Sequence, residues 1–196
     1  PTDFCVAMKL SAGHTALLAA DDGVDHIFIP SLIRRVRDKT PSHMFCIYTE
    51  AEGFLPEDDL GLPKGKVIRP VLHLGDRKQM ARSLEKELAR VGHRFSGQQI
   101  NEALREADAR EEAFNGELAR LGDAFLENLR RNDEKGYVGI GRDYVVLDPA
   151  ASSDTGRMFA TVRGMAYIPQ VFLSHLYAGI PLDDLVDNEY WEHSSE

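Results

Sequence analysis

The chain has 196 residues, of which 43% are hydrophobic and 28% are charged, and its net charge is −9. This composition indicates a soluble globular protein, and no apolar run approaches the ~20 residues that a membrane-spanning helix requires. Nucleic acid and anionic membrane surfaces are not expected as partners, because binding them depends on clustered Lys and Arg side chains. Two cysteines are too few for a disulfide-stabilised secreted scaffold, so a reducing cytoplasm is expected.

Residues 1–75 predict one helix followed by three short strands. The apolar residues between Cys5 and Ala20 fall on a helical stripe, which ends at Asp21-Asp22-Gly23. Pro70 interrupts the last of the strands and favours a strand start or a sheet edge there. The three apolar runs of strand length are Val24–Ile29, Met44–Tyr48 and Val67–Leu72.

Residues 76–135 are rich in Ala, Leu, Glu, Arg and Lys with helical periodicity. The segment Gly92–Gly97 divides them into two predicted helices, one over Asp76–Val91 and a longer one that Ser96 caps. Gly116 and Gly122 lie inside the longer helix. Each glycine there costs about 1 kcal/mol relative to alanine, so we expect a bend or a close contact at these positions.

Residues 136–196 return to alternating strands and helices. We expect strands at Tyr137–Gly141 and Met165–Ile168, a helix over Asp154–Arg163 and a helix start at Pro181–Leu185. Strand and helix therefore alternate on both sides of the helical segment. This pattern predicts an α/β fold of mainly parallel strands, with two lobes at residues 1–75 and 136–196 joined by the helices of residues 76–135.

Cys5 is the first candidate for chemistry, because it directly precedes a predicted helix. The N–H groups and the positive end of the helix dipole favour a thiolate at such a position, and thiolates are the ligands of iron–sulfur clusters. The alternative is a small buried hydrophobic side chain. That alternative is stronger for Cys46, which lies inside a predicted strand. Two distant cysteines do not by themselves complete a four-thiolate site.

Histidines and glycines give weaker signals. His14 follows a glycine in the middle of the first predicted helix, which indicates close helix packing or a functional contact. His43 and Cys46 have the spacing of a zinc-ligand pair. No other His or Cys residues form a second such pair, so we do not expect a zinc site. The glycines of Gly136–Gly141 fit neither a dinucleotide-binding motif nor a P-loop. Arg142, at the end of this predicted strand, either faces a ligand or belongs to a plain turn.

The segment Cys5–His14, followed by Gly23–Pro30, resembles a module of 2-hydroxyacyl-CoA dehydratase-related proteins and of large CoA-substrate-specific enzyme activases, the DUF2229 type. The shared pattern is a cysteine, a lysine and a Gly-His pair, followed by a Gly-Val-Asp-x-Ile-Phe-x-Pro strand. Three further motifs extend the resemblance over nearly the whole chain. They are the cysteine-bearing strand at Phe45-Cys46, a Gly-Arg-x-Tyr-x-x-x-Asp-Pro segment at Gly141–Pro149 and an Asn-x-Tyr-Trp segment at Asn188–Trp191.

The resemblance implies an α/β fold of two Rossmann-like lobes, in which three cysteines hold a 4Fe-4S cluster at the lobe junction. Cys5 matches the first family cysteine and Cys46 matches the second, while the third lies beyond the end of this chain. The resemblance also implies an ATP-hydrolysing activator domain or a dehydratase subunit as the partner, with an acyl-CoA as a further ligand. The candidate contacts for such a ligand are Lys9, His14, Arg142 and Tyr144.

The chain departs from the family pattern in one loop and at its start. Asp143 stands where the family has a proline, and Ser153–Gly156 replaces an Asn-Gly-Ile-Pro sequence. The resemblance also implies a strand and a helix before the first cysteine, and we expect this chain to lack them. We therefore expect both lobes to be incomplete and the 196 residues alone to be catalytically inactive.

The leading hypothesis is a domain of a CoA-substrate-specific enzyme activase or dehydratase-related protein that binds an iron–sulfur cluster for low-potential electron transfer. The alternative is a cluster-free interaction or scaffolding domain of a large activase polypeptide, which the altered Arg142-Asp143 loop and the low cysteine count favour. A third and weaker hypothesis is a lobe that binds CoA or another small molecule. The sequence leaves open whether the protein is itself an enzyme.

Overall fold

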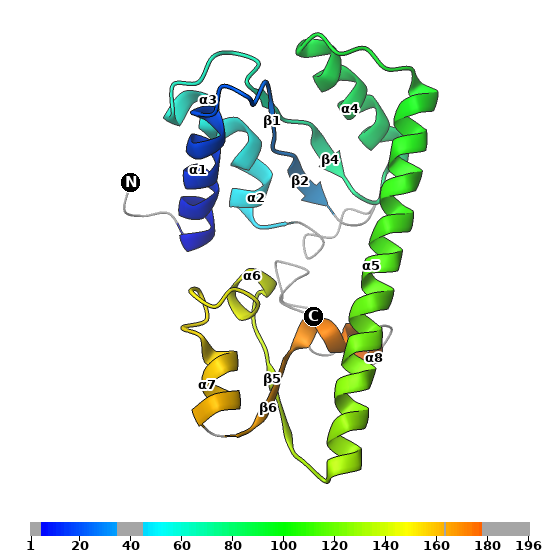
Figure 1. Cartoon of the computed structure of the whole chain (residues 1–196). Coiled ribbons are helices and arrows are strands. Elements are labelled where there is room, and N and C mark those ends of the chain that lie inside the picture. The colour runs from blue at the N-terminus through cyan, green and yellow to red at the C-terminus, as the bar shows by residue number, and fades with distance from the viewer. Residues whose placement is uncertain (1–4, 35–44, 163, 178–196) are drawn as a thin grey trace. The chain divides into compact units, whose positions relative to one another are not determined.

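The structure, a computed structural model, describes residues 5–34, 45–162 and 164–177 (Figure 1). These residues form two compact units. Unit 1 comprises the described residues up to Arg105, and unit 2 comprises those from Glu106 onward. The division falls inside one long helix, and each unit has strands and helices of its own. Within the described ranges, every helix is too short or too polar to pass through a lipid bilayer.

Unit 1 combines parallel strands with several helices. Its elements are α1 Val6–Ala19, β1 Ile27–Phe28, β2 Ser31–Arg34, α2 Ile47–Ala51, the 3-10 helix η1 Glu52–Phe54, α3 Leu55–Asp59, β3 Val67–Ile68, β4 Val71–His73, α4 Arg77–Arg90 and the first part of α5 Gly97–Asn132. The three helices predicted for this part of the chain are confirmed as α1, α4 and α5. Ser96 caps α5 as predicted, since its hydroxyl accepts from the Gln99 amide at 3.3 Å.

At two of the predicted strands, a proline separates two shorter strands. β1 pairs with β3 and β2 pairs with β4, both in parallel, and the register places Pro30 opposite Pro70. The strand predicted at Val24–Ile29 is continued past Pro30 by Ser31–Arg34, and the one predicted at Val67–Leu72 is divided at Pro70. Proline lacks the N–H group that a continuous ladder needs, so the regular pairing stops at this level.

The backbone still forms hydrogen bonds across this interruption. The Ile29 amide donates to the Ile68 carbonyl at 2.9 Å, and the Ser31 amide donates to the Pro70 carbonyl at 2.9 Å. The return bond to the Ile29 carbonyl cannot form, because Pro70 has no amide hydrogen. Gly53 of η1 lies against that carbonyl, and a Cβ atom added to Gly53 would stand 2.5 Å from the Ile29 oxygen. Only glycine therefore fits at this position.

The strand predicted at Met44–Tyr48 is wrong. Met44 lies outside the described residues, and the rest of the run leads into α2, which continues through η1 into α3. A short apolar run fits a strand and a buried helical turn equally well, so the residues that follow determine which of the two forms. Glu50 lies in the first turn of α2, where the helix dipole favours a carboxylate. Cys46 therefore precedes a helix and does not lie inside a strand.

The core of unit 1 consists of two apolar clusters. One is formed by Ile27, Ile29 and Val67, with Ala19, Val24 and Leu62 packed against them. The other joins β4 to α4 and α5 and is formed by Leu72, Met80, Ile100 and Leu104. The apolar stripes predicted for α4 and for the start of α5 therefore face the core, as amphipathic helices normally do.

Unit 2 contains the second part of α5 and one parallel strand pair. Its other elements are β5 Gly136–Gly139, α6 Asp143–Val146, α7 Thr155–Val162, β6 Ala166–Pro169, η2 Gln170–Leu173 and α8 Ser174–Tyr177. β5 pairs with β6 in parallel, with Tyr137 opposite Tyr167. Both predicted strands and the predicted helix of this region are confirmed, while the helix start expected at Pro181–Leu185 lies outside the described residues.

The two glycines inside α5 differ in their surroundings. A Cβ atom added to Gly122 would overlap the Phe172 carbonyl oxygen, so the expected close contact is present there. Gly116 has open space around it, and α5 continues through both glycines. Gly122 is thus required by packing, whereas Gly116 is not required by any described neighbour.

Helices combined with short parallel strands confirm an α/β character for the described residues. The strands occur in two-stranded ladders within the described part of the chain. The finer expectation of two Rossmann-like lobes, and the three-part division at residues 75 and 135, stay predictions.

Candidate functional site

Cys5 directly precedes α1, as the sequence predicts. Its backbone is extended, with φ −62° and ψ 161°, and its carbonyl accepts from the Lys9 amide at 3.2 Å. The thiol is free and exposed, and it makes no capping hydrogen bond. Cys5 therefore presents its sulfur at the positive end of a 14-residue helix, where the first backbone N–H groups have no partner within the helix.

Cys46 occupies the corresponding position before α2. Its backbone is also extended, with φ −56° and ψ 137°, and its carbonyl accepts from the Glu50 amide at 3.1 Å. The Phe45 amide donates to the Ile33 carbonyl at 3.2 Å, and this hydrogen bond links the residue before Cys46 to β2. The thiol is free and half-buried. The two cysteines thus share one local setting, the residue before a helix, which the prediction of a strand at Cys46 had missed.

α1 and α2 lie in the same part of unit 1, and their first turns lie at the same end in Figure 1. The hydroxyl of Ser11 on α1 donates to the carboxylate of Glu52, which directly follows α2. This hydrogen bond links the two helical segments. The cysteines that precede α1 and α2 therefore belong to the same end of unit 1.

The donor set fits an iron–sulfur cluster in kind but not in number. Thiolate sulfur is the ligand that such a cluster requires. Among residues 5–34, 45–162 and 164–177, no three His, Cys, Asp or Glu side chains gather closely enough to hold a metal ion. The described part of the chain therefore supplies two thiols of the right chemistry, and further ligands would have to come from elsewhere.

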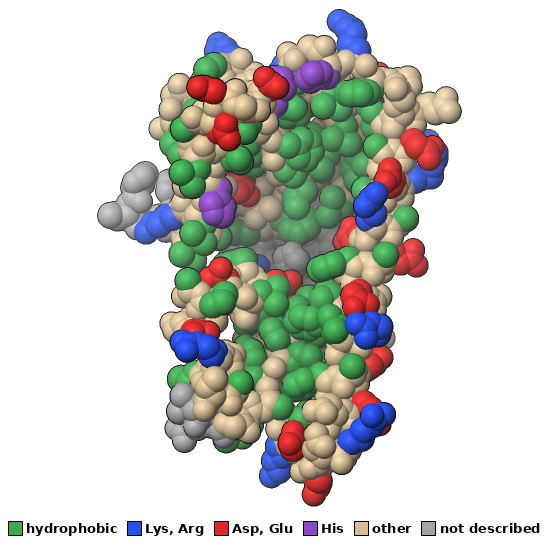
Figure 2. All heavy atoms as spheres, in the orientation of Figure 1, with side chains coloured by type: hydrophobic (Ala, Val, Ile, Leu, Met, Phe, Trp, Pro, Cys, Tyr) green, Lys and Arg blue, Asp and Glu red, His purple; other side chains and the backbone are tan. Residues whose placement is uncertain are grey.

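α1 exposes an apolar face that the described core does not cover. Val6, Leu10 and Leu17 are 53%, 48% and 73% exposed, and a Cβ atom on Gly13 would meet no atom within 4 Å. Their spacing places these residues on one side of the helix, and hydrophobic side chains reach the surface along α1 in Figure 2. Thr15, on the opposite side, is only 3% exposed. We call Val6, Leu10, Gly13 and Leu17 the α1 apolar face.

Lys9 and His14 are exposed on α1, on either flank of the α1 apolar face. Arg142 and Tyr144 belong to unit 2, where Arg142 lies between β5 and α6 and its carbonyl accepts from the Val145 amide at 2.8 Å. Both side chains are exposed at the carboxyl end of β5, the usual place for ligands in open α/β sheets. The four candidate ligand contacts are therefore divided between the two units.

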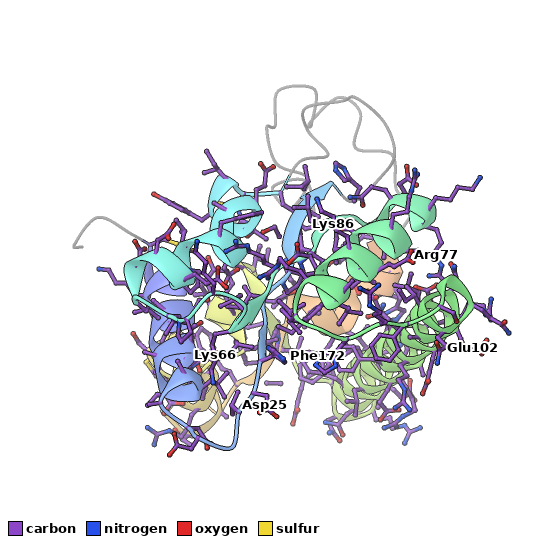
Figure 3. The ribbon with its side chains drawn as sticks, turned by 90° about the horizontal axis from the view of Figure 1, so that it is seen from above. Asp25, Lys66, Arg77, Lys86, Glu102 and Phe172 are labelled. Atoms are coloured by element: carbon purple, nitrogen blue, oxygen red, sulfur yellow. The ribbon has the colours of Figure 1, made fainter. Side chains whose placement is uncertain are left out.

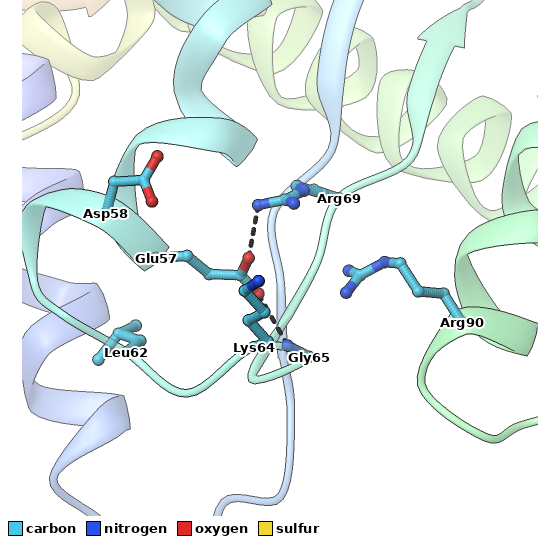
Figure 4. A pocket seen from close by; sticks show the side chains of 7 residues that line it. All are labelled: Glu57, Asp58, Leu62, Lys64, Gly65, Arg69 and Arg90. Atoms are coloured by element: carbon cyan, nitrogen blue, oxygen red, sulfur yellow. Dashed lines mark hydrogen bonds and ion pairs between the residues drawn. The ribbon is translucent and has the colours of Figure 1, made fainter.

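Unit 1 also contains a polar hollow that no motif in the sequence announces. The carboxylate of Glu57 is only 8% exposed and accepts from the Arg69 guanidinium at 2.6 Å. In the sequence Glu57 stands beside Asp58 and Asp59, as in a solvated acidic turn, so only the fold reveals its burial. The hollow has a volume of about 520 Å³ and is lined by Glu57, Asp58, Leu62, Lys64, Gly65, Arg69 and Arg90 (Figure 4).

A family model described as CoA enzyme activase uncharacterised domain (DUF2229) matches residues 1–172. No curated protein and no solved structure matches the chain. The matched range contains both cysteines, the four candidate ligand contacts, the polar hollow and the six strands of the described residues.

Proposed function

Because the chain belongs to the CoA enzyme activase uncharacterised domain family, we propose that it acts within such an activase by binding an iron–sulfur cluster. Cys5 and Cys46 serve as two of the cluster ligands. A bound cluster would supply low-potential electron transfer. The observation that supports this proposal is the shared setting of the two thiols, each on the residue before a helix and both at one end of unit 1.

The electrostatics of a helix start suit a thiolate-ligated cluster. Such clusters carry negative charge, and the unpaired N–H groups of a first helical turn lie where they offset it. Cys5 offers this setting with an exposed thiol, which leaves the sulfur open to incoming iron. Cys46 is half-buried, and limited solvent access is one of the factors that set a cluster's reduction potential.

The remaining ligands lie outside the described residues, in this polypeptide or in a partner. For the partner we propose a dehydratase subunit or an ATP-hydrolysing activator domain, in keeping with the activase family. An acyl-CoA is the ligand that we propose for Lys9, His14, Arg142 and Tyr144. We propose a cytoplasmic location, since free thiols serve as ligands only where they stay reduced.

The proposal is tested by preparing the chain without oxygen and supplying iron, sulfide and an excess of a small thiol, which fills any ligand position that the chain leaves open. We expect bound iron with visible thiolate-to-iron absorption in the wild-type chain. Cys5→Ser and Cys46→Ser should each lose most of both signals, because serine is a poor ligand for a soft iron–sulfur centre.

Met8→Leu is the matched control, because it removes a sulfur atom from α1 one turn after Cys5 and leaves both thiols in place. This variant should keep its iron. A wild-type chain that binds no iron, or a Cys5→Ser variant that keeps all of it, would contradict the cluster proposal.

The second candidate function is a cluster-free interaction domain, and the α1 apolar face favours it. This face leaves Leu17 73% exposed, and exposed apolar side chains that lie together mark contact surfaces. If the chain binds no iron yet forms a complex with a dehydratase subunit that Leu10→Ser and Leu17→Ser abolish, this second function is the correct one.

A further inference from the structure

The polar hollow of unit 1 lies beside the start of β3 (Figure 4). Its volume of about 520 Å³ lies within the range of small-molecule sites, roughly 300–1,000 Å³. Three of its lining side chains are cationic, namely Lys64, Arg69 and Arg90. We call it the Arg69–Arg90 hollow.

The buried carboxylate of this hollow is already engaged. Glu57 accepts from Arg69 Nη1 at 2.6 Å, from the Gly65 amide at 3.0 Å and from the Val67 amide at 3.4 Å. Asp58 is exposed and also lines the hollow, and in Figure 4 its carboxylate points toward the side on which Arg69 lies. An incoming anion would therefore meet the Glu57 carboxylate, which these donors engage, and the exposed Asp58 carboxylate, beside the three cationic side chains of the lining.

Both guanidinium groups are held in place and retain unused donors. Arg69 lies over the Phe54 ring, 5.1 Å from its centroid. Arg90 donates from Nη2 to the Val67 carbonyl at 2.6 Å and from Nε to Glu87 at 2.9 Å. Arg69 Nη2 and Arg90 Nη1 have no acceptor among the described residues. Figure 4 shows both guanidinium groups directed into the space between α3 and α4.

We propose that the Arg69–Arg90 hollow binds the phosphoryl group of a small phosphorylated molecule. Fixed guanidinium groups suit this role, because their planar N–H donors match phosphate oxygens and their desolvation is less costly than that of an ammonium. A phosphoryl group brings up to about two negative charges and three acceptor oxygens, enough for both arginines and Lys64. A carboxylate brings only one charge. Leu62 is the one aliphatic side chain in the lining, so charge and hydrogen bonds dominate recognition.

This site is separate from the cysteines. The loop before β3 and the last turn of α4 lie at the opposite end of unit 1 from the first turns of α1 and α2 (Figure 1). Phosphoryl binding at the Arg69–Arg90 hollow is therefore a further function, and it does not depend on whether the cysteines bind iron.

The test is isothermal titration of the 196-residue chain with pyrophosphate at low ionic strength, with acetate at equal ionic strength as the reference anion. We expect saturable binding of pyrophosphate at one site and much weaker binding of acetate. Lys64→Gln should weaken pyrophosphate binding roughly three- to tenfold, and Arg90→Lys about tenfold, because lysine keeps the charge but loses the planar fork.

Lys86→Gln is the matched control, since Lys86 is an exposed cation on α4 that does not line the hollow (Figure 3). It should change the affinity by less than about twofold, as expected for screened surface charge. If Arg90→Lys fails to fold, Lys64→Gln decides, because the Lys64 side chain is exposed. The proposal is overturned by the absence of saturable pyrophosphate binding, by acetate binding as tightly, or by equal losses in Lys64→Gln and Lys86→Gln.

A second titration with adenosine diphosphate separates the two sources of a phosphoryl group. Tighter binding than that of pyrophosphate indicates an organic phosphate, and equal binding indicates a free inorganic one. Either result supports the site, provided that Lys64→Gln weakens both ligands equally. Adenosine diphosphate binding that Lys64→Gln leaves unchanged would place that ligand elsewhere and count against the hollow.

Discussion

Both units contain parallel strand pairs, and the β1–β3 pair of unit 1 is more buried than the β5–β6 pair of unit 2. In unit 1, the facing residues Ile27 and Val67 are 5% and 0% exposed. In unit 2, Ile168 is 6% exposed, whereas the facing Val138 is 47% exposed. Parallel strands are normally covered on both faces. In unit 1 the described residues therefore bury both residues of β3 and Ile27 of β1, while Phe28 of β1 is 53% exposed; in unit 2 they leave every residue of β5 exposed or half-buried.

The covering side chains differ as well. Unit 1 uses aliphatic clusters and the close approach of Gly53 to a backbone carbonyl. Unit 2 uses aromatic rings, with Phe159 lying 5.2 Å from Tyr137 and 5.6 Å from Tyr167 between ring centroids. Aromatic rings cover a large area with few residues. Unit 1 should therefore be sensitive to small changes of volume, and the open strand of unit 2 should tolerate them.

The largest expected effect is that of Gly53→Ala in unit 1. The added Cβ atom would stand 2.5 Å from the Ile29 carbonyl oxygen and 3.0 Å from Arg69 Cβ, so the strand pair or η1 must shift. We expect unit 1 to lose about 3 kcal/mol of stability, the upper end of the usual range for overpacking. Urea unfolding followed by hydrogen exchange mass spectrometry, which separates the two units, measures this loss.

Gly13→Ala is the control for that experiment. Its Cβ atom would enter open space in the middle of α1, so alanine should stabilise the helix by up to about 1 kcal/mol. If Gly53→Ala leaves the unfolding midpoint of unit 1 unchanged, the proposed contact between η1 and the interrupted strands is wrong.

A smaller effect is expected from a matched pair of valine substitutions, one in each strand pair. Val67→Ala removes two methyl groups from a fully buried site and should cost about 2 kcal/mol through lost contacts and a residual cavity. Val138→Ala acts on a side chain that is 47% exposed and should cost less than about 0.5 kcal/mol. The same exchange experiment reports both values, and similar losses for the two variants would remove the contrast between the units.

Periodic and capped helices could be predicted from the sequence because their signals are local. α4 begins within one residue of its predicted start at Asp76, and α5 begins after its predicted cap Ser96. The side chains of Asp76 and Ser96 each accept from the amide three residues later. The helix at Cys46 could not be predicted, because a short apolar run has no period that separates strand from helix. The register that places Pro30 opposite Pro70 could not be predicted either, because it depends on pairing between strands that are far apart in the sequence.

In the candidate functional sites as well, features with local sequence signals could be predicted and features that depend on distant contacts could not. The position of Cys5 before a helix follows from local signals, and the structure agrees with it. The buried Glu57 and the Arg69–Arg90 hollow depend on contacts between α3, β3 and α4, and each residue alone looks like a solvated charge. The exposure of the α1 apolar face could not be predicted either. An apolar stripe in a sequence indicates that one side of a helix makes contacts, but it does not show whether the core of the same chain covers that side.

The smallest effect is expected at Glu117 in unit 2, and it depends on pH. Both carboxylate oxygens of Glu117 accept from Arg120, at 2.7 Å and 2.5 Å. This hydrogen bonding lowers the pKa of Glu117 below its usual value of 4.5. A carboxyl whose pKa is lower in the folded than in the unfolded chain stabilises the fold above the unfolded value, and it loses that contribution as the pH falls through the folded value.

Glu117→Gln should therefore slightly destabilise the middle of α5 at pH 7. It should make no difference well below pH 4.5, where the wild-type carboxyl is protonated and uncharged like the glutamine. The effect stays small because both side chains are exposed and solvent screens the pair. Hydrogen exchange of the α5 amides at the two pH values measures it. Glu111→Gln, on a solvent-exposed part of the same helix, is the control, and an equal change in both variants would show that net charge rather than the Glu117–Arg120 pair is responsible.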